Sequence, residues 1–297
     1  MIKKSTGKIS GELYALGSSA LPAFLLMGKM PILFDAGMTF MGPLYLKELE
    51  KYLGQPERLA YNLLTHSHFD HCGSAPFLKR KIRELKTGAS RLAAGIFKRP
   101  NAIQLIRSLS SDMEKKFQSQ IGNSDVSFPG LDVEVLLEDG DEIDLGDGYK
   151  VQVITTPGYT RDAVSFYIPK IKALIPGEAV GVLDLHFNIQ PEFLSSYEDY
   201  MTSLEKLALL DIQIIMMGHS NVLTKDNAKG HVAKSIEKTK IFRKRMENFL
   251  DALGGDKEAV VKKIFQEDYV EARAVQQDQR PYLINLQAKV KAIAEGK

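Results

Sequence analysis

The stretch Thr65 to Gly73, THSHFDHCG, places three histidines and an aspartate within six consecutive residues. The whole chain has only six histidines, so half of them lie in this short segment. Imidazole nitrogens together with a carboxylate are ligands for zinc, iron or manganese, whereas a thiolate zinc site needs several cysteines. A polar loop with incidental histidines accounts for one histidine better than for the pattern H-x-H-x-D-H. We therefore predict a metal site here.

The histidine stretch follows a short apolar run, RLAYNLLT, which we expect to be a strand. Side chains alternate in direction along an extended segment, so His66, His68 and Asp70 would point the same way. His71 would follow where the chain turns toward a helix at residues 74–85, and Gly73 would allow that bend.

Other elements must bring further residues to this segment. Glycine punctuation and apolar runs predict strands at residues 8–17, 22–28, 31–37, 162–169, 171–177 and 212–218, and hairpin strands separated by Asp-Gly turns at 131–156. Helices are expected at 43–54, closed by Gly54, at about 101–120, and at 197–210, where Ser195 and Glu198 would form a capping box. From about Thr224 every pattern is helical, and no linker is visible. We expect a catalytic domain at 1–223 and a helical extension at 224–297 packed on the active-site side.

The amino-acid composition and net charge indicate which classes of binding partner to expect. The chain has 297 residues, of which 44% are apolar and 26% charged, and its net charge is +2. These values are ordinary for a globular protein and favour neither a nucleic-acid nor a membrane partner. The apolar stretch ALPAFLLM is interrupted by Gly28 and Lys29, well short of a bilayer span. The single cysteine, Cys72, excludes an internal disulfide and is typical of a reducing compartment, so we expect a cytoplasmic protein.

Five short motifs together resemble the metallo-β-lactamase superfamily. They are FDAG (residues 34–37), THSHFDHCG (65–73), TPGYT (156–160), PGEA (176–179) and GHS (218–220), and they occur in the order and spacing of that family. The resemblance implies an α/β fold, a four-layer αββα sandwich with metals at one edge of its two sheets. The helical tail is similar to that of the glyoxalase II-like branch, which includes PqsE-like thioesterases.

By this resemblance His66 and His68 would hold one divalent metal, and Asp70, His71 and His219 would hold another. Zinc and iron are the leading candidates, manganese is a third, and one or two ions per chain are expected. The chain departs from the family pattern at two ligand positions. Tyr159 replaces the histidine of T-P-G-H-T, and Glu178 stands where the family has a bridging aspartate.

Both departures leave two interpretations open. Tyr159 either ligates as a phenolate, which iron tolerates, or does not bind metal and leaves the first site weakened or empty. Glu178, one methylene longer than aspartate, either bridges the metals from a backbone set farther back or only forms hydrogen bonds at the site. Loss of the histidine also argues against sulfur dioxygenase chemistry, because the mononuclear iron enzymes of this superfamily use that residue.

Other residues are candidates for supporting roles. Asp35 would orient the histidine loop by resemblance, or simply end a strand. Cys72 is more typical of a small buried residue than of a ligand. His186, Tyr197 and Tyr282 would line a substrate pocket under the tail, although a surface position is the simpler expectation for His186. The basic segment KTKIFRKRM (238–246) is expected on a solvated helix face, which argues against a nuclease.

The leading functional hypothesis is a metal-dependent hydrolase of a small-molecule thioester or lactone, in which metal-bound hydroxide attacks an activated carbonyl. Asp70 would be the catalytic residue that anchors the nucleophile and accepts its proton. The second hypothesis is a member of the same superfamily that has lost efficient catalysis and acts as a ligand-binding or regulatory protein. The oligomeric state is left open, with a homodimer among the candidates.

Overall fold

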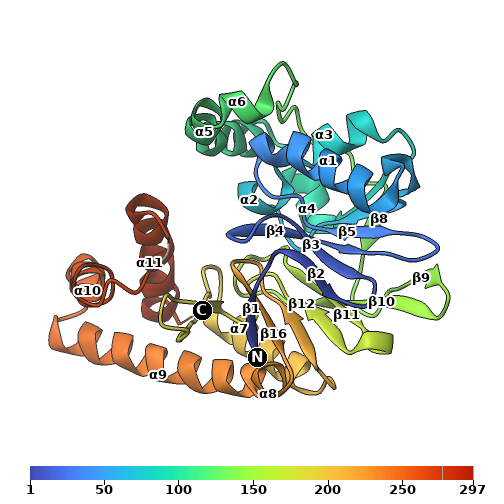
Figure 1. Cartoon of the computed structure of the whole chain (residues 1–297). Coiled ribbons are helices and arrows are strands. Elements are labelled where there is room, and N and C mark those ends of the chain that lie inside the picture. The colour runs from blue at the N-terminus through green and yellow to red at the C-terminus, as the bar shows by residue number, and fades with distance from the viewer. Residues whose placement is uncertain (276, 297) are drawn as a thin grey trace.

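The computed structural model describes residues 1–275 and 277–296. Two seven-stranded sheets face one another (Figure 1). The first sheet has the order β2 (Gly7–Ser10), β3 (Leu13–Ser18), β4 (Leu21–Leu26), β5 (Ile32–Phe34), β6 (Tyr61–Leu63), β7 (Lys86–Ser90) and β8 (Val135–Leu137). The second has the order β1 (Ile2–Lys4), β16 (Asn221–Thr224), β15 (Ile214–Met216), β12 (Ala173–Ile175), β11 (Val164–Ile168), β10 (Tyr149–Thr155) and β9 (Glu142–Gly146).

Helices cover the outer face of each sheet. Above the first sheet in Figure 1 lie α1 (Gly42–Leu53), α3 (Ala75–Lys81), α4 (Arg91–Ile96), α5 (Pro100–Lys116) and α6 (Gln118–Ile121). The second sheet is covered by α7 (Tyr197–Ala208), α8 (Asp226–Lys229) and the start of α9 (His231–Ala252). Short 3-10 turns occupy Thr39–Met41, Pro56–Arg58 and Pro169–Ile171. This is the predicted four-layer αββα arrangement, which is confirmed.

Three apolar clusters hold the layers together. Between the sheets, side chains such as Phe24, Phe34 and Phe166 interleave, and the rings of Phe34 and Phe166 lie 5.3 Å apart. A second cluster joins the first sheet to its helices, and a third joins the other sheet to α7 and the tail. Because both faces of each sheet are covered, strands such as β5 and β11 are buried along their whole length.

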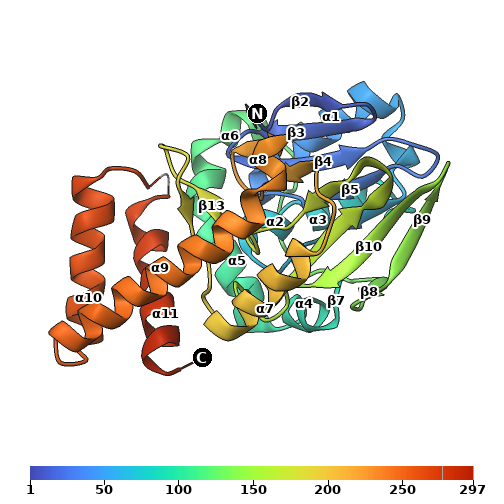
Figure 2. The ribbon, with the colours of Figure 1, turned by 90° about the horizontal axis from the view of Figure 1, so that it is seen from below.

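The tail consists of α9, α10 (Lys257–Ile264), a π-helical turn at Phe265–Glu271 and α11 (Gln279–Ala294). Figure 2 shows α9 running from beneath the body to α10 and α11, which stand together beyond the edge of the sandwich. Met246 of α9, Val260 of α10 and Leu286 of α11 belong to the same buried cluster as the outer face of the second sheet. The C-terminal helices are therefore present as predicted, and they share a core with the body.

Several local predictions need correction. The strand β8 pairs in parallel with β7 and so belongs to the first sheet, which makes only β9 and β10 a hairpin. The Asp139–Gly140 turn thus connects the two sheets. Its counterpart at Asp147 and Gly148 has positive φ at both residues, as a tight hairpin turn requires.

The cap of α7 was predicted one residue too early. The side chain of Ser196 accepts a hydrogen bond from the Asp199 backbone N–H, whereas the Ser195 hydroxyl donates to the Gly158 carbonyl. The capping box of Ser195 and Glu198 is therefore wrong. Ser195 instead ties the start of α7 to the loop that carries Tyr159.

Candidate functional site

The histidine stretch lies at the edge of the sheets, directly after β6. It does not continue as an extended segment, because a short helix, α2 (Phe69–Cys72), begins after His68. Asp70 and His71 are therefore neighbours on one helical turn, and the predicted alternation of side chains ends at His68. Cys72 is fully buried and its sulfur lies 3.6 Å from the Ser67 carbonyl oxygen, which confirms it as a small core residue.

Three more strand ends supply residues to the same place. Tyr159 lies between β10 and β11, Glu178 follows β12, and His219 lies in the turn between β15 and β16. Gly218 is required beside them, because a Cβ atom there would lie 2.5 Å from the Glu178 carboxylate. Residues separated by more than a hundred positions thus meet at one edge of the sandwich.

The Glu178 carboxylate is the centre of the site. Its Oε1 lies 3.0 Å from His71 Nε2 and 3.1 Å from His219 Nε2, and its Oε2 lies 3.5 Å from His66 Nε2. On the solvent side, Asp70 Oδ2 is 3.8 Å from His219 Nε2. The potential ligand atoms fall into two overlapping groups, His66–His71–Glu178 and Asp70–His71–His219, each within 4.8 Å.

The other nitrogen of each of these histidines has a fixed partner. His71 Nδ1 lies 2.8 Å from Asp35, His66 Nδ1 lies 2.9 Å from the Thr65 hydroxyl, and His219 Nδ1 lies 3.0 Å from the Ala20 carbonyl oxygen. The Thr65 hydroxyl and backbone N–H also donate to Asp35. Because an acceptor at Nδ1 holds a proton there, Nε2 of each ring is the nitrogen that would bind a metal once the ring is neutral.

These atoms fit a divalent metal. Nε2 of His66 and His71 and both carboxylate oxygens of Glu178 are buried without a hydrogen-bond partner among the described residues, although they lie close together. Leaving such groups unpaired costs about 1–3 kcal/mol each unless a ligand satisfies them. Tetrahedral ligands about 2.1 Å from a zinc ion lie about 3.4 Å from one another, close to the separations around Glu178.

Charges at the site are arranged to suit a cation. Burial opposes a charge on His71, but the carboxylates of Glu178 and Asp35 raise its pKa well above the ordinary value. Burial also disfavours the Glu178 carboxylate, yet the neighbouring histidines hold its pKa well below the usual range. Glu178 is therefore an anion in the folded protein. In the absence of a metal its charge is balanced by the proton on His71, and a bound divalent cation would take the place of that proton.

His68 lies outside both groups of ligand atoms. Its Nδ1 lies 3.0 Å from the Tyr159 hydroxyl, and burial, together with nearby carboxylates, raises the pKa of that phenol well above its ordinary value. A neutral phenol can donate to or accept from an imidazole nitrogen, and in both cases this hydrogen bond engages His68 Nδ1. His68 and Tyr159 lie close to the other candidate ligands, but among the described residues they form a hydrogen bond with each other.

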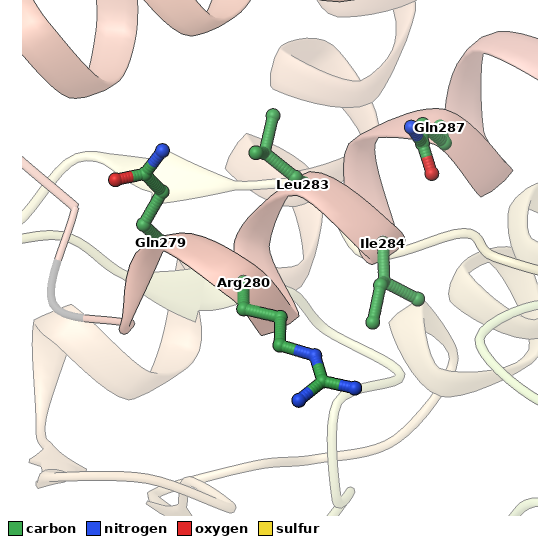
Figure 3. A pocket seen from close by; sticks show the side chains of 5 residues that line it. All are labelled: Gln279, Arg280, Leu283, Ile284 and Gln287. Atoms are coloured by element: carbon green, nitrogen blue, oxygen red, sulfur yellow. The ribbon is translucent and has the colours of Figure 1, made fainter.

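The predicted pocket residues are dispersed. His186 is exposed in the turn between β13 (Val182–Leu183) and β14 (Ile189–Gln190), and Tyr197 is buried against Phe193 at the start of α7. Tyr282 packs at tilted angles against Phe265 and Tyr269 in the tail. An open pocket of about 430 Å³ lies along α11, where Gln279, Arg280, Leu283, Ile284 and Gln287 line it, and none of these is a metal-capable residue (Figure 3).

Sequence reasoning missed or undervalued several contributors. The Asp162 carboxylate accepts a hydrogen bond from the Ser67 backbone N–H and so holds the histidine loop. Thr65, Tyr200, Glu192 and Lys289 were not singled out. Thr65 lies inside the motif and could have been found there, whereas no local pattern marks the other three.

Comparisons with known proteins agree with this geometry. The model of the metallo-β-lactamase superfamily matches residues 28–219. A metallo-β-lactamase fold-containing protein of Sulfurisphaera tokodaii is 24% identical over 196 residues, covering 62% of this chain and 69% of that protein. A hydroxyacylglutathione hydrolase of Brucella anthropi is 34% identical over 106 residues, which is 35% of this chain and 37% of that one.

Solved structures share the fold at low identity. An archaeal metallo-β-lactamase superfamily protein from Sulfolobus tokodaii has a TM-score of 0.60 and 17% identity, covering 97% of this chain and 100% of that one. The subclass B3 metallo-β-lactamase BJP-1 of Bradyrhizobium japonicum has a TM-score of 0.58 and 19% identity, covering 84% and 98%. The family model spans well over half of the chain and ends at His219, the last residue of the cluster. The chain therefore belongs to the metallo-β-lactamase superfamily.

Proposed function

We propose that this protein is a metal-dependent hydrolase of an activated carbonyl, a thioester or a lactone. The observation that carries the proposal is the convergence of three histidine Nε2 atoms on the buried carboxylate of Glu178, with Nδ1 of each ring already engaged. Such a set of nitrogen and oxygen atoms is suited to hold a divalent cation. The partial likeness to a hydroxyacylglutathione hydrolase, whose named substrate is a thioester, favours the thioester over the lactone.

The residues would divide the work as follows. His66, His71, His219 and Glu178 would hold the ion, zinc or iron by the nature of these ligands. A bound divalent cation polarises a carbonyl and lowers the pKa of water toward about 7, which supplies a nucleophile near neutral pH. Asp70 is partly exposed beside His219, so its carboxylate would orient the attacking water and accept its proton. Asp35 would keep His71 in the required tautomer.

The hydrogen bond between His68 and Tyr159 favours a single ion. Because the Tyr159 hydroxyl engages His68 Nδ1, that nitrogen is not free to bind a second ion. We therefore expect about one ion per chain.

The proposal is tested by metal analysis of protein purified without added metal, together with hydrolysis assays on acyl-CoA, glutathione thioester and lactone substrates. We expect about one ion per chain and turnover of at least one thioester, with both lost in His219→Ala. His231→Gln changes a histidine outside the site and should retain both. Less than about 0.3 ion per chain with no turnover on any substrate would refute the hydrolase.

The second candidate is a ligand-binding or regulatory member without efficient catalysis. It is favoured by one observation, that Glu178 already lies within ion-pair distance of three histidines. In that case the carboxylate would neutralise the cluster in place of a metal. Ligand binding by metal-free protein, with no turnover after zinc or iron is added, would favour this candidate over the enzyme.

A further inference from the structure

A second buried glutamate lies between the metal centre and the tail. Glu192, in the segment between β14 and α7, is only 8% exposed. Its Oε1 accepts a hydrogen bond from Lys289 Nζ of α11 at 2.9 Å, and the same ammonium donates to the Pro191 carbonyl at 2.8 Å. Lys289 is itself buried. This pair fastens α11 to the body.

The other oxygen of Glu192 has no such role. Glu192 Oε2 is buried and has no hydrogen-bond partner among the described residues. Docking of the tail needs only Oε1, so docking does not explain why an oxygen is kept desolvated and unpaired. A buried carboxylate oxygen of this kind is suited to accept a hydrogen bond from a ligand. Without a partner the buried oxygen carries a desolvation cost, and a hydrogen bond from a ligand removes that cost.

Glu192 is coupled closely to the metal centre. The Tyr200 hydroxyl donates to the Glu178 carbonyl at 3.3 Å and accepts from the Glu192 backbone N–H at 3.4 Å, so one phenol joins the backbones of the two glutamates. Glu192 therefore lies between the candidate metal ligand Glu178 and helix α11 of the tail. Burial raises the pKa of the Glu192 carboxyl, and the Lys289 ammonium opposes that rise.

We propose that Glu192 is a specificity-determining residue whose Oε2 accepts a hydrogen bond from an uncharged donor, a hydroxyl or an amide N–H, on the substrate. This inference rests on the proposed hydrolase function and adds a feature of the substrate to it. The donor is uncharged because Lys289 already balances the carboxylate, so a substrate ammonium would be buried beside an excess of positive charge. The donor lies either on the acyl group or on the thiol that leaves.

Matched substrates test the inference on the wild-type protein. The first pair of thioesters differs on the acyl side, with a hydroxyl in one and its methyl ether in the other. The second pair differs on the thiol side, with an N-acetylcysteamine amide N–H in one and its N-methyl form in the other. We expect kcat/KM to fall about 10- to 100-fold on methylation in one pair, which identifies the donor's position. Ratios within about twofold in both pairs would overturn the inference.

The variant Glu192→Gln separates recognition from packing. A glutamine nearly matches the shape of glutamate and can offer its carbonyl oxygen to Lys289, which leaves an NH2 group in place of the free acceptor. We expect the preference for the unmethylated substrate to shrink to within about twofold. The control Glu142→Gln alters an exposed glutamate paired with Lys150 on β9 and should keep the wild-type preference. A full preference retained in Glu192→Gln would overturn the inference, because a merely structural role does not distinguish the two substrates.

Failure of the hydrolase proposal is distinguishable from failure of this inference. If the wild-type protein hydrolyses none of the thioesters, the proposed function fails. Calorimetric binding of the corresponding thioethers, which cannot be hydrolysed, then tests Glu192 directly. Tighter binding of the unmethylated thioether by wild-type protein but not by Glu192→Gln supports the inference, and equal affinities for both members of each pair overturn it.

Discussion

The ring of Tyr159 packs edge-on against two histidines of the motif, with centroids 5.2 Å from His66 and 4.9 Å from His68. Its place in the chain is that of a metal-binding histidine in the family resemblance, yet its hydroxyl is neutral and forms a hydrogen bond with His68 Nδ1. This one residue thus removes an imidazole from the site and engages a ring nitrogen of another histidine. Glu178 has the opposite effect, since its longer side chain reaches all three remaining histidines.

The variant Tyr159→His should restore metal capacity. A histidine there would supply an imidazole nitrogen and release His68 Nδ1, so two donors become available together. We expect the metal content, measured by mass spectrometry after dialysis against zinc, to rise by about one ion per chain. Tyr159→Phe is the matched control, because it releases His68 but adds no ligand, and it should show no such gain. An unchanged metal content in Tyr159→His would contradict the prediction, because the added imidazole and the released His68 would then not form a second site.

At the scale of elements, the sequence predicts a strand or helix correctly when the residues that determine it are close together in the chain. The strands before Asp35 and His66, the helix ending at Gly54 and the motif itself are local features, and they were predicted. The start of α2 at Phe69 was missed, because four residues of helix give no periodicity to detect. The pairing of β8 with β7 was missed because an Asp-Gly turn favours a hairpin, and only tertiary packing decides which sheet a strand joins.

The candidate site shows the same division between local and distant. Motif matches named the residues that meet around Glu178, but not the direction of each ring. His68 could not be separated from His66 by sequence, because its orientation depends on a phenol ninety-one positions away. Glu192 and Lys289 were missed for a similar reason, since ninety-seven positions separate them and neither lies in a motif.

The helix α9 begins at a buried histidine, His231, and we predict that this contact between body and tail makes the stability of the fold sensitive to acid. His231 Nε2 lies 3.1 Å from the Val180 carbonyl oxygen, and burial lowers the pKa of His231 to about 4. In the unfolded chain its pKa is near 6.5. Between these two pH values His231 is protonated in the unfolded chain and neutral in the folded chain. Its contribution to the free energy of unfolding is therefore fully present above about pH 6.5 and is lost as the pH falls toward 4.

The variant His231→Gln tests this contact, because glutamine can still donate to Val180 but does not titrate. From pH 7.5 to 5 the wild type should lose about 2 kcal/mol more unfolding free energy than His231→Gln. Urea unfolding of both proteins at the two pH values measures the difference. Parallel losses in the two proteins would show that the pKa of His231 is not displaced by folding.

At the scale of the whole molecule, the candidate metal centre connects the two sheets, which also meet through apolar packing and a few hydrogen bonds such as that from Ser67 to Asp162. Its residues come from the ends of strands in both sheets, so a cation bound there would bind the native state and not the unfolded chain. The tail shares a core with the second sheet and reaches the site through Lys289 and Glu192. Site and tail are therefore expected to respond together to ligand.

Removal of metal should lower thermal stability. At a zinc concentration about 100 times the dissociation constant, binding adds about 2.7 kcal/mol to the native state, or about 4 °C in Tm for a chain of this length. Calorimetry before and after dialysis against a chelator measures the shift. His219→Ala should reduce it, and His231→Gln, a histidine outside the site, should not. A shift of equal size in His219→Ala would place the bound ion elsewhere.

The strand β1 pairs with β16, from Ile2 opposite Leu223 to Lys4 opposite Asn221, while β2 turns away into the other sheet. During synthesis on a ribosome, therefore, the opening residues emerge more than two hundred positions before the partner that will hold them. The edge next to His219 can be completed only once nearly the whole sandwich has left the exit tunnel. The strand β1 therefore stays unpaired until β16 has been synthesised, and the turn bearing His219 becomes fixed only then.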